Sequence, residues 1–113
     1  MPDCIFCKIA KGEIKSDIVF ENEKLIAFKD LNPQAPIHIL IIPKKHISRV
    51  ENLSEENSSL MGELIITAKQ IADKMNIKNG YRLVFNNGEN GGQEVEHIHL
   101  HLLAGRKFTW PPG

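Results

Sequence analysis

The stretch from His97 to Leu103 reads His-Ile-His-Leu-His-Leu-Leu, so histidine alternates with aliphatic residues. Successive side chains of a β-strand point to opposite faces, so a strand here places all three imidazoles on one face. The aliphatic side chains are then buried on the other face, which fixes the register. Neutral imidazole is a nucleophile, a proton carrier and a metal ligand near neutral pH. The pattern predicts polar chemistry on this face, and the alternative is a half-buried strand with histidines on its polar side.

A glycine-rich loop, from Asn86 to Gln93, precedes this stretch. Glycine lets backbone N–H groups approach a ligand closely, which is how many loops hold phosphate oxygens. By itself a loop of Asn and Gly is most often a hairpin turn. Its attachment to the histidine strand favours the interpretation as a ligand-binding loop.

Two cysteines, Cys4 and Cys7, stand at a spacing that zinc sites use. A closed tetrahedral site needs two more ligands, and His46 and His97 are the candidates because each lies near the end of a predicted strand. The alternatives are buried reduced thiols or a redox pair. A thioredoxin-like pair requires a βαβ setting, which this sequence lacks.

Short elements surround these residues. Ile5 to Ala10 predicts a short helix ending at Gly12, with an apolar face of Ile5, Phe6 and Ile9. The apolar runs 18–20 and 25–28 predict a hairpin with a polar turn. The run 38–42 is almost continuously apolar, which indicates a central strand with His38 at its beginning.

One long amphipathic helix follows. Ser54 with Glu55 and Glu56 resembles an N-cap and an acidic first turn. Apolar residues then recur at steps of three and four, and we expect the helix to end near Asn79-Gly80. The run 81–85 predicts a strand that forms an antiparallel pair with the histidine strand.

Length and composition limit the class of protein. The chain has 113 residues, 42% of them hydrophobic, with 14 basic and 14 acidic side chains, so we expect a single domain spanning 1–113. The zero formal charge argues against nonspecific binding to nucleic acid or membrane surfaces. No stretch is long and apolar enough to cross a membrane, and we expect a cytoplasmic protein. The apolar C-terminal tail around Trp110 predicts packing on its own domain or on a partner subunit.

The chain resembles the histidine triad (HIT) family, and more narrowly its nucleotide-binding branch. Motifs distributed over nearly the whole length carry the resemblance. They are Ile5-Phe6, Gln34-Ala35-Pro36-x-His38, Pro43-Lys44-Lys45-His46-Ile47, Gly91-Gly92-Gln93, the triad itself and Trp110-Pro111-Pro112-Gly113. The resemblance implies an α+β fold with a five-stranded antiparallel sheet, one long helix and one short helix. It also implies a homodimer with a continuous sheet, in which the Trp110 tail reaches the partner's site.

The same resemblance implies hydrolysis of purine nucleoside phosphoramidates to a nucleoside monophosphate and an amine. His99 would be the nucleophile and form a nucleotidyl-histidine intermediate, while His101 and His38 would contact the phosphate and guide proton transfer. Asp30 would hold the ribose hydroxyls. The residues expected to bind the nucleotide are Asp30, Asn86, Gln93, Val95, Ile5, Phe6, Ile9, Phe28 and Leu31.

The sequence departs from the animal members of the family in two places. Glu94 stands where they carry a serine that donates to the phosphate, and a carboxylate repels phosphate instead. The cysteine pair is absent from the animal type and present in zinc-containing relatives. That similarity implies structural zinc on Cys4, Cys7, His46 and His97. A dinucleoside polyphosphate hydrolase, or a purine nucleotide-binding module with little turnover, are the alternative functions.

Overall fold

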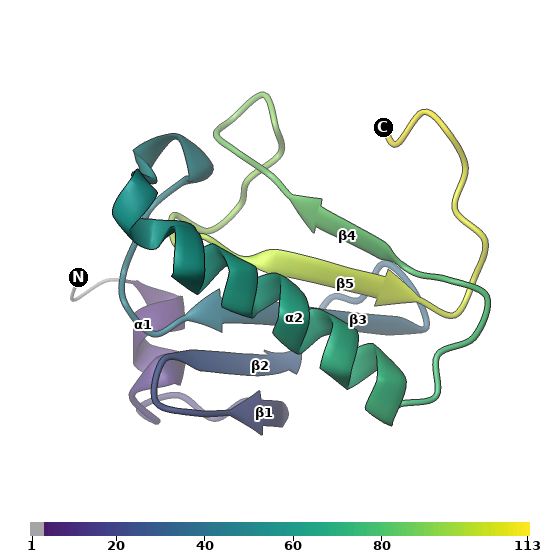
Figure 1. Cartoon of the computed structure of the whole chain (residues 1–113), viewed down its shortest axis with the longest axis horizontal. Coiled ribbons are helices and arrows are strands. Elements are labelled where there is room, and N and C mark those ends of the chain that lie inside the picture. The colour runs from purple at the N-terminus through teal and green to yellow at the C-terminus, as the bar shows by residue number, and fades with distance from the viewer. Residues whose placement is uncertain (1–3) are drawn as a thin grey trace.

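The computed structural model describes residues 4–113 and contains one sheet of five antiparallel strands in the order β1-β2-β3-β5-β4 (Figure 1). The strands are β1 (Ile18–Glu21), β2 (Leu25–Lys29), β3 (Ile37–Pro43), β4 (Arg82–Phe85) and β5 (Leu100–Ala104). The helices are α1 (Ile5–Ala10) and α2 (Ser58–Lys74), with 3₁₀ turns at Val50–Asn52 and Glu55–Asn57. The expected α+β fold, with one long and one short helix on a five-stranded sheet, is confirmed.

Strands β2 and β3 are buried on both faces because a helix packs on each face. On one face, Leu25 and Ala27 of β2 belong to the same apolar cluster as Leu64, Ala68 and Ile71 of α2, which crosses the sheet in Figure 1. On the other face, the alternate β2 residues cluster with Phe6 and Ile9 of α1. The sheet residues of this second cluster are Ile26, Phe28, Leu40 and Ile42. Burial on both faces explains why β2 and β3 are almost continuously apolar.

The register of β5 against β3 decides where the histidines lie. Leu40 is paired with His101, and His38 with Leu103, so His38 and His101 are diagonal neighbours on the α1 face. Leu100 and Leu102 belong to the α2 cluster on the opposite face. The predicted alternation is therefore confirmed, although β5 begins only at Leu100 and the first two histidines lie before it, with His97 in a bend.

The predicted start and end of the long helix need correction. Ser54 caps the 3₁₀ turn Glu55–Asn57, where its backbone N–H donates to Asn57 Oδ1 at 2.9 Å, and α2 itself begins at Ser58. The helix ends at Lys74, five residues before Asn79, because Asn76 takes a left-handed backbone conformation with φ of 55°. Asn79-Gly80 belongs instead to the turn that leads into β4.

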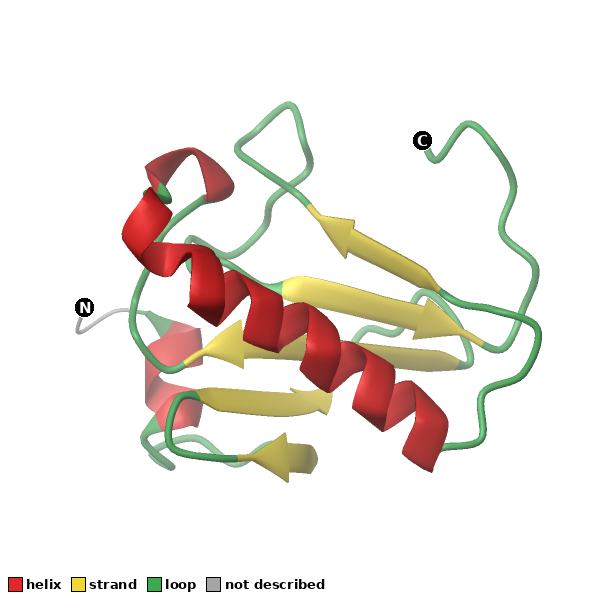
Figure 2. Ribbon diagram, in the orientation of Figure 1, coloured by secondary structure: helices red, strands yellow, loops and turns green. Residues whose placement is uncertain are grey.

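The elements next to the cysteines and next to His46, His97 and His99 meet at one end of the sheet. Figure 2 shows β3 and β4 ending there, β5 beginning there, and α1 lying beside them. The C-terminal tail extends from the opposite end of β5, where Phe108 lies against the guanidinium groups of Arg82 and Arg106 while Trp110 remains 83% exposed. In residues 4–113 no helix is long and apolar enough to span a membrane.

Candidate active site and metal centre

His99 is held in one tautomer by the main chain. Its Nδ1 lies 2.7 Å from the carbonyl oxygen of His97, so Nδ1 carries the proton and donates it, and the lone pair is on Nε2. The ring of Phe6 packs edge-on against His99, with centroids 5.2 Å apart. Burial lowers the pKa of His99, and the hydrogen bond to the carbonyl only partly opposes that shift. His99 is therefore a neutral imidazole of fixed orientation, as a nucleophile requires.

His38 and His101 form a directed hydrogen-bond relay. The backbone N–H of Gln34 donates to Nδ1 of His38 at 3.0 Å, so His38 carries its proton on Nε2. That Nε2 lies 2.8 Å from Nδ1 of His101, which must accept. Neutral His101 then has its proton on Nε2, a buried atom with no hydrogen-bond partner among residues 4–113. Burial lowers the pKa of His101 to about 4. The relay ends in an N–H group that is available to a ligand.

Asp30 lies beside this relay. Its Oδ2 is 3.4 Å from Nε2 of His38, and its Oδ1 accepts the backbone N–H of Asn32 at 2.8 Å. Burial lowers the pKa of His38, and the Asp30 carboxylate opposes this shift. The ligand atoms of Asp30, His38 and His101 lie close enough to hold a metal ion. In this arrangement Nε2 of His38 carries a proton and offers no lone pair to a metal ion.

A cavity of about 410 Å³ opens over the three histidines His38, His99 and His101. This volume is typical of a small-molecule site. Of the residues expected to bind the nucleotide, all but Gln93 line it. They are Asp30, Asn86, Val95, Ile5, Phe6, Ile9, Phe28 and Leu31. The cavity has an apolar end formed by α1 and β2 next to a polar end formed by the histidines.

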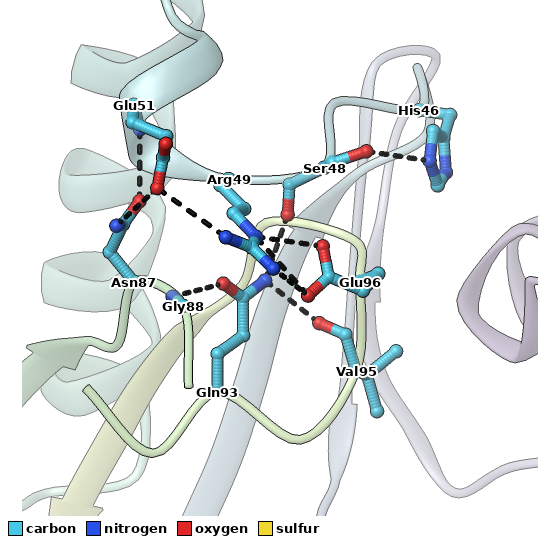
Figure 3. Close-up of polar contacts among 9 residues, drawn as sticks. All are labelled: His46, Ser48, Arg49, Glu51, Asn87, Gly88, Gln93, Val95 and Glu96. Carbon is cyan, nitrogen blue, oxygen red and sulfur yellow. Dashed lines mark hydrogen bonds and ion pairs between the residues drawn. The ribbon is translucent and has the colours of Figure 1, made fainter. Parts of the chain in front are cut away.

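Gln93 lies outside the cavity lining and holds the glycine-rich loop in place. Its side-chain Oε1 accepts the N–H of Gly88 at 2.9 Å, and its Nε2 donates to the carbonyl oxygens of Ser48 and Val95 at 2.8 and 2.9 Å (Figure 3). These contacts use most of the hydrogen-bonding capacity of the amide. Gln93 therefore acts on the backbone next to the cavity and positions Val95.

Further polar contacts fasten the loop to the segment that follows β3 (Figure 3). Asn87 exchanges two hydrogen bonds with Glu51, at 2.9 Å to the backbone N–H and 2.8 Å to the carboxylate. The guanidinium of Arg49 makes a bidentate pair with Glu96, with both shorter contacts at 2.9 Å. A side chain at Gly91 would bring its Cβ within 2.5 Å of the Asn87 carbonyl oxygen. The loop is thus tightly folded, and only glycine fits at that position.

A second cluster of chemically active residues adjoins the cavity, since Cys4 and Cys7 flank the cavity residues Ile5 and Phe6 in the chain. Nδ1 of His97 is 3.3 Å from Sγ of Cys4 and 3.5 Å from Sγ of Cys7. Nδ1 of His46 is 3.3 Å from Sγ of Cys7 and 3.2 Å from Nδ1 of His97. In a tetrahedral zinc site the ligand atoms are about 3.3 to 3.8 Å apart. The four residues lie close enough to hold a metal ion, and their spacing is compatible with zinc.

The tautomer of His97 suits a metal ligand. Nε2 of His97 donates to the carbonyl oxygen of Pro43 at 2.7 Å, so its Nδ1 carries a lone pair that faces the cluster. Nδ1 of His46 lies 3.2 Å from that atom, and Nε2 of His46 lies 3.4 Å from the Ser48 hydroxyl, a group that can donate or accept.

The cysteines come from the first turn of α1. Sγ of Cys4 accepts the backbone N–H of Cys7 at 3.3 Å, so Cys4 is both the helix N-cap and a candidate ligand. In the protein without metal, burial and the neighbouring Cys4 thiol raise the pKa of the Cys7 thiol. A bound metal ion would reverse this preference, because a coordinating thiol is deprotonated.

The sequence did not identify every residue of the cavity. Ile14, Lys15 and Ser16 line it from the connection between α1 and β1, which has no periodic pattern. The Ser16 hydroxyl is buried without a hydrogen-bond partner among the described residues. The acceptor role of His38 Nδ1 also depends on a backbone group, the N–H of Gln34, which no residue type could have revealed.

Comparisons with known proteins give a consistent result. The family model of the HIT domain matches residues 11–108. An uncharacterized HIT-like protein of Synechocystis is 49% identical over 111 residues, which cover 98% of this chain and 97% of the relative. A similar protein of Synechococcus elongatus has the same identity and the same coverage.

Solved structures agree with the sequence matches. A HIT family hydrolase from Legionella pneumophila superimposes with a TM-score of 0.96 at 54% identity, covering 98% of this chain and 100% of that chain. A histidine triad protein from Clostridium difficile superimposes with a TM-score of 0.93 at 43% identity, covering 96% of each chain.

Proposed function

This chain belongs to the HIT domain family, and on that premise we propose that it hydrolyses purine nucleoside phosphoramidates to a nucleoside 5′-monophosphate and an amine. Its likeness to HIT family hydrolases supports the reaction class. The observation that carries the proposal is the tautomer of His99. Nδ1 of His99 lies 2.7 Å from the His97 carbonyl oxygen and donates its proton to it. The Nε2 lone pair of His99, a cavity residue, is therefore free to attack phosphorus.

In the first step, Nε2 of His99 attacks the phosphorus and forms an N–P bond while the bond from phosphorus to the amine breaks. The electron pair of the broken bond goes to the amine nitrogen, which takes the Nε2 proton of His101 and leaves as a neutral amine. The His38–His101 pair must therefore hold one extra proton when substrate is bound. The phosphoryl anion and the Asp30 carboxylate, 3.4 Å from His38, both favour that state.

In the second step, water attacks the nucleotidyl-histidine. The now neutral His38–His101 pair takes the proton of the water, and the N–P electron pair returns to His99. The pair is thereby restored to its starting protonation state. Catalysis needs no further proton donor, because one relay serves as acid in the first step and as base in the second.

The nucleotide fits the polarity of the cavity. The base would lie against the apolar end formed by Ile5, Phe6 and Phe28, and Asp30 would accept hydrogen bonds from the ribose hydroxyls. The Asn86 side chain and backbone N–H groups near Val95 would meet the phosphoryl oxygens. Gln93 would contribute indirectly through its hydrogen bonds to the loop.

We further propose structural zinc and membership of the zinc-containing group of the nucleotide-binding branch. The ligands would be Cys4, Cys7, His46 and His97. Four protein ligands close the coordination shell, so such an ion would join α1 to the segment before β5 without taking part in the reaction. The requirement for reduced thiols fits a cytoplasmic location.

A homodimer is the expected assembly. β4 is an edge strand whose Leu83 is 36% exposed, and α2 exposes Ile65 and Ile66 at 45% and 55%. Pairing of β4 with a second copy would cover these side chains and remove an open sheet edge. Trp110, 83% exposed at the end of the sheet away from α1, would then be available to the partner's site. Light scattering of the purified protein tests this assembly.

The function is tested by steady-state hydrolysis of an adenosine 5′-phosphoramidate by the wild type and by His99→Ala. We expect turnover in the wild type, no turnover in the variant, and nucleotide binding in both. Intact-mass measurement after rapid denaturation at alkaline pH should detect nucleotidylated wild-type protein.

Diadenosine polyphosphate, assayed side by side, distinguishes the alternative hydrolase. Preference for that substrate would overturn the proposed specificity. Nucleotide binding without turnover of any substrate would identify a binding module.

A further inference from the structure

Glu94 presents a free carboxylate to the cavity. It follows Gln93, whose amide is held by three hydrogen bonds, and it lines the cavity together with His99 and His101. Its side chain is exposed and makes no hydrogen bond or ion pair with any residue in the range 4–113. The carboxylate therefore has no compensating cation or hydrogen-bond donor among these residues at the polar end of the site.

Glu96, two residues further along the chain, is a carboxylate with a structural role. Glu96 is not part of the cavity lining and pairs with Arg49 through two 2.9 Å contacts (Figure 3). The charge of Glu96 is thus compensated within the fold, whereas the charge of Glu94 is not. No contact with the residues in the range 4–113 therefore explains a carboxylate at position 94.

Glu94 shares the cavity with the proposed reacting centre, because it lines that cavity together with His99 and His101. A carboxylate in that lining acts by Coulomb interaction on a phosphoryl group bonded to the His99 ring. Its effect on the negatively charged phosphoryl oxygens is unfavourable for every nucleotide substrate. Only the amine part of the substrate can carry a positive charge that makes the interaction with the Glu94 carboxylate favourable.

We infer that Glu94 is a specificity residue for the leaving group and selects amines that carry a second, positively charged group close to the reacting nitrogen. Diamines and basic amino acids belong to this chemical class. The inference rests on the function proposed above and specifies which phosphoramidates the site prefers. Asp30 cannot fill the same role, because it faces His38 at 3.4 Å.

The expected effect is modest because Glu94 is exposed to solvent. Ion pairs of exposed side chains contribute up to about 1 kcal/mol, which corresponds to about a five-fold change in kcat/KM. Such an effect should weaken as salt screens the charges.

The test uses three adenosine 5′-phosphoramidates whose amines are similar in size and differ in charge: ethylenediamine, ethanolamine and glycine. The measured quantity is kcat/KM for each substrate with the wild type, Glu94→Gln and Glu89→Gln. Glu89 is a matched control, since it is an exposed acid of the same loop that does not line the cavity. Each substrate is compared with itself across the variants, so intrinsic differences in reactivity cancel.

We expect Glu94→Gln to lower the ratio of the ethylenediamine to the ethanolamine substrate about five-fold and to raise the relative rate of the glycine substrate. Glu89→Gln should leave both ratios unchanged, and high salt should reduce the wild-type preference. Turnover of the ethanolamine substrate with equal ratios in wild type and Glu94→Gln would overturn the inference alone. Absence of turnover with all three substrates would overturn the proposed function, and the inference with it.

Discussion

Nε2 of His38 lies 2.8 Å from Nδ1 of His101, and the direction of this hydrogen bond is fixed by a backbone N–H on the far side of the His38 ring. A main-chain group outside the triad therefore decides that His101 presents N–H, and not a lone pair, to the cavity. His99 is fixed in the opposite sense by the His97 carbonyl. In the proposed reaction the two rings therefore take different roles, His99 as the nucleophile and His101 as the acid.

The relay predicts how the rate depends on the leaving group. His101→Gln keeps a donor near the Nε2 position but cannot transfer a proton, so we expect kcat/KM for an alkylamine phosphoramidate to fall roughly 100-fold or more. A weakly basic aromatic amine leaves without full protonation, and its rate should fall much less. Measurement of both substrates checks the assignment, and an equal loss for both would contradict it.

The metal centre predicts that the purified protein contains zinc in equimolar amount and that Cys4→Ser loses it. Serine retains a helix N-cap acceptor at the start of α1, so a lower Tm in this variant reports the lost metal and not a lost cap. Elemental analysis and thermal unfolding provide the measurements. Wild-type protein that is free of metal and keeps its full Tm after chelation would refute the site.

The buried histidines predict a loss of stability in mild acid. The ordinary histidine pKa is 6.5 and burial lowers that of His101 to about 4, so between these values the unfolded chain binds more protons than the folded one. The contribution of His101 to the free energy of unfolding is complete above pH 6.5 and declines as the pH falls toward 4. Burial also lowers the pKa values of His38 and His99, which act in the same direction.

Urea unfolding at several pH values in this range measures the decline. His101→Gln removes one titrating group and leaves all four candidate metal ligands in place, so its stability should depend less steeply on pH. If the free energy of unfolding depends on pH with the same slope in His101→Gln and in the wild type, His101 has the same pKa in the folded and the unfolded chain, which would contradict this prediction.

The loop predicts a supporting role for Gln93. Gln93→Leu removes three hydrogen bonds and leaves the N–H of Gly88 and two carbonyl oxygens without their partner, which should cost about 2 kcal/mol of stability and weaken nucleotide binding. Asn87→Ala removes only exposed contacts to Glu51 and serves as the milder control. Denaturant unfolding and a nucleotide Kd check both effects. Equal losses in the two variants would show that burial of the Gln93 contacts is unimportant.

The sequence predicted those features that depend on side-chain periodicity. Alternation in the histidine stretch placed the imidazoles opposite Leu100 and Leu102, and the continuous apolar run identified β3 as central. The sequence also identified His46 and His97 as candidate ligands, because they lie near the ends of two strands that are far apart in the chain. These predictions succeeded because each reflects a face that must be buried.

Features that depend on the main chain could not be predicted in this way. The end of α2 at Lys74 follows from the backbone conformation of Asn76, while Asn79-Gly80 was the more conspicuous stop signal. The tautomers of His38 and His99 depend on an N–H and a carbonyl group that every residue type possesses. Sequence patterns identified which residues meet, and the backbone geometry decided what each can do.

His97 contributes two different groups, its imidazole and its main-chain carbonyl, and a substitution at this position affects only the first. Its side chain is a ligand of the proposed metal centre, but the group that orients His99 is its carbonyl oxygen, which any residue at that position would supply. Substitutions that abolish the metal centre can therefore accumulate in descendants of this chain without discarding the nucleophile. The proposed metal centre and the catalytic use of His99 can therefore change independently in separate lineages, although His97 contributes to both in this chain.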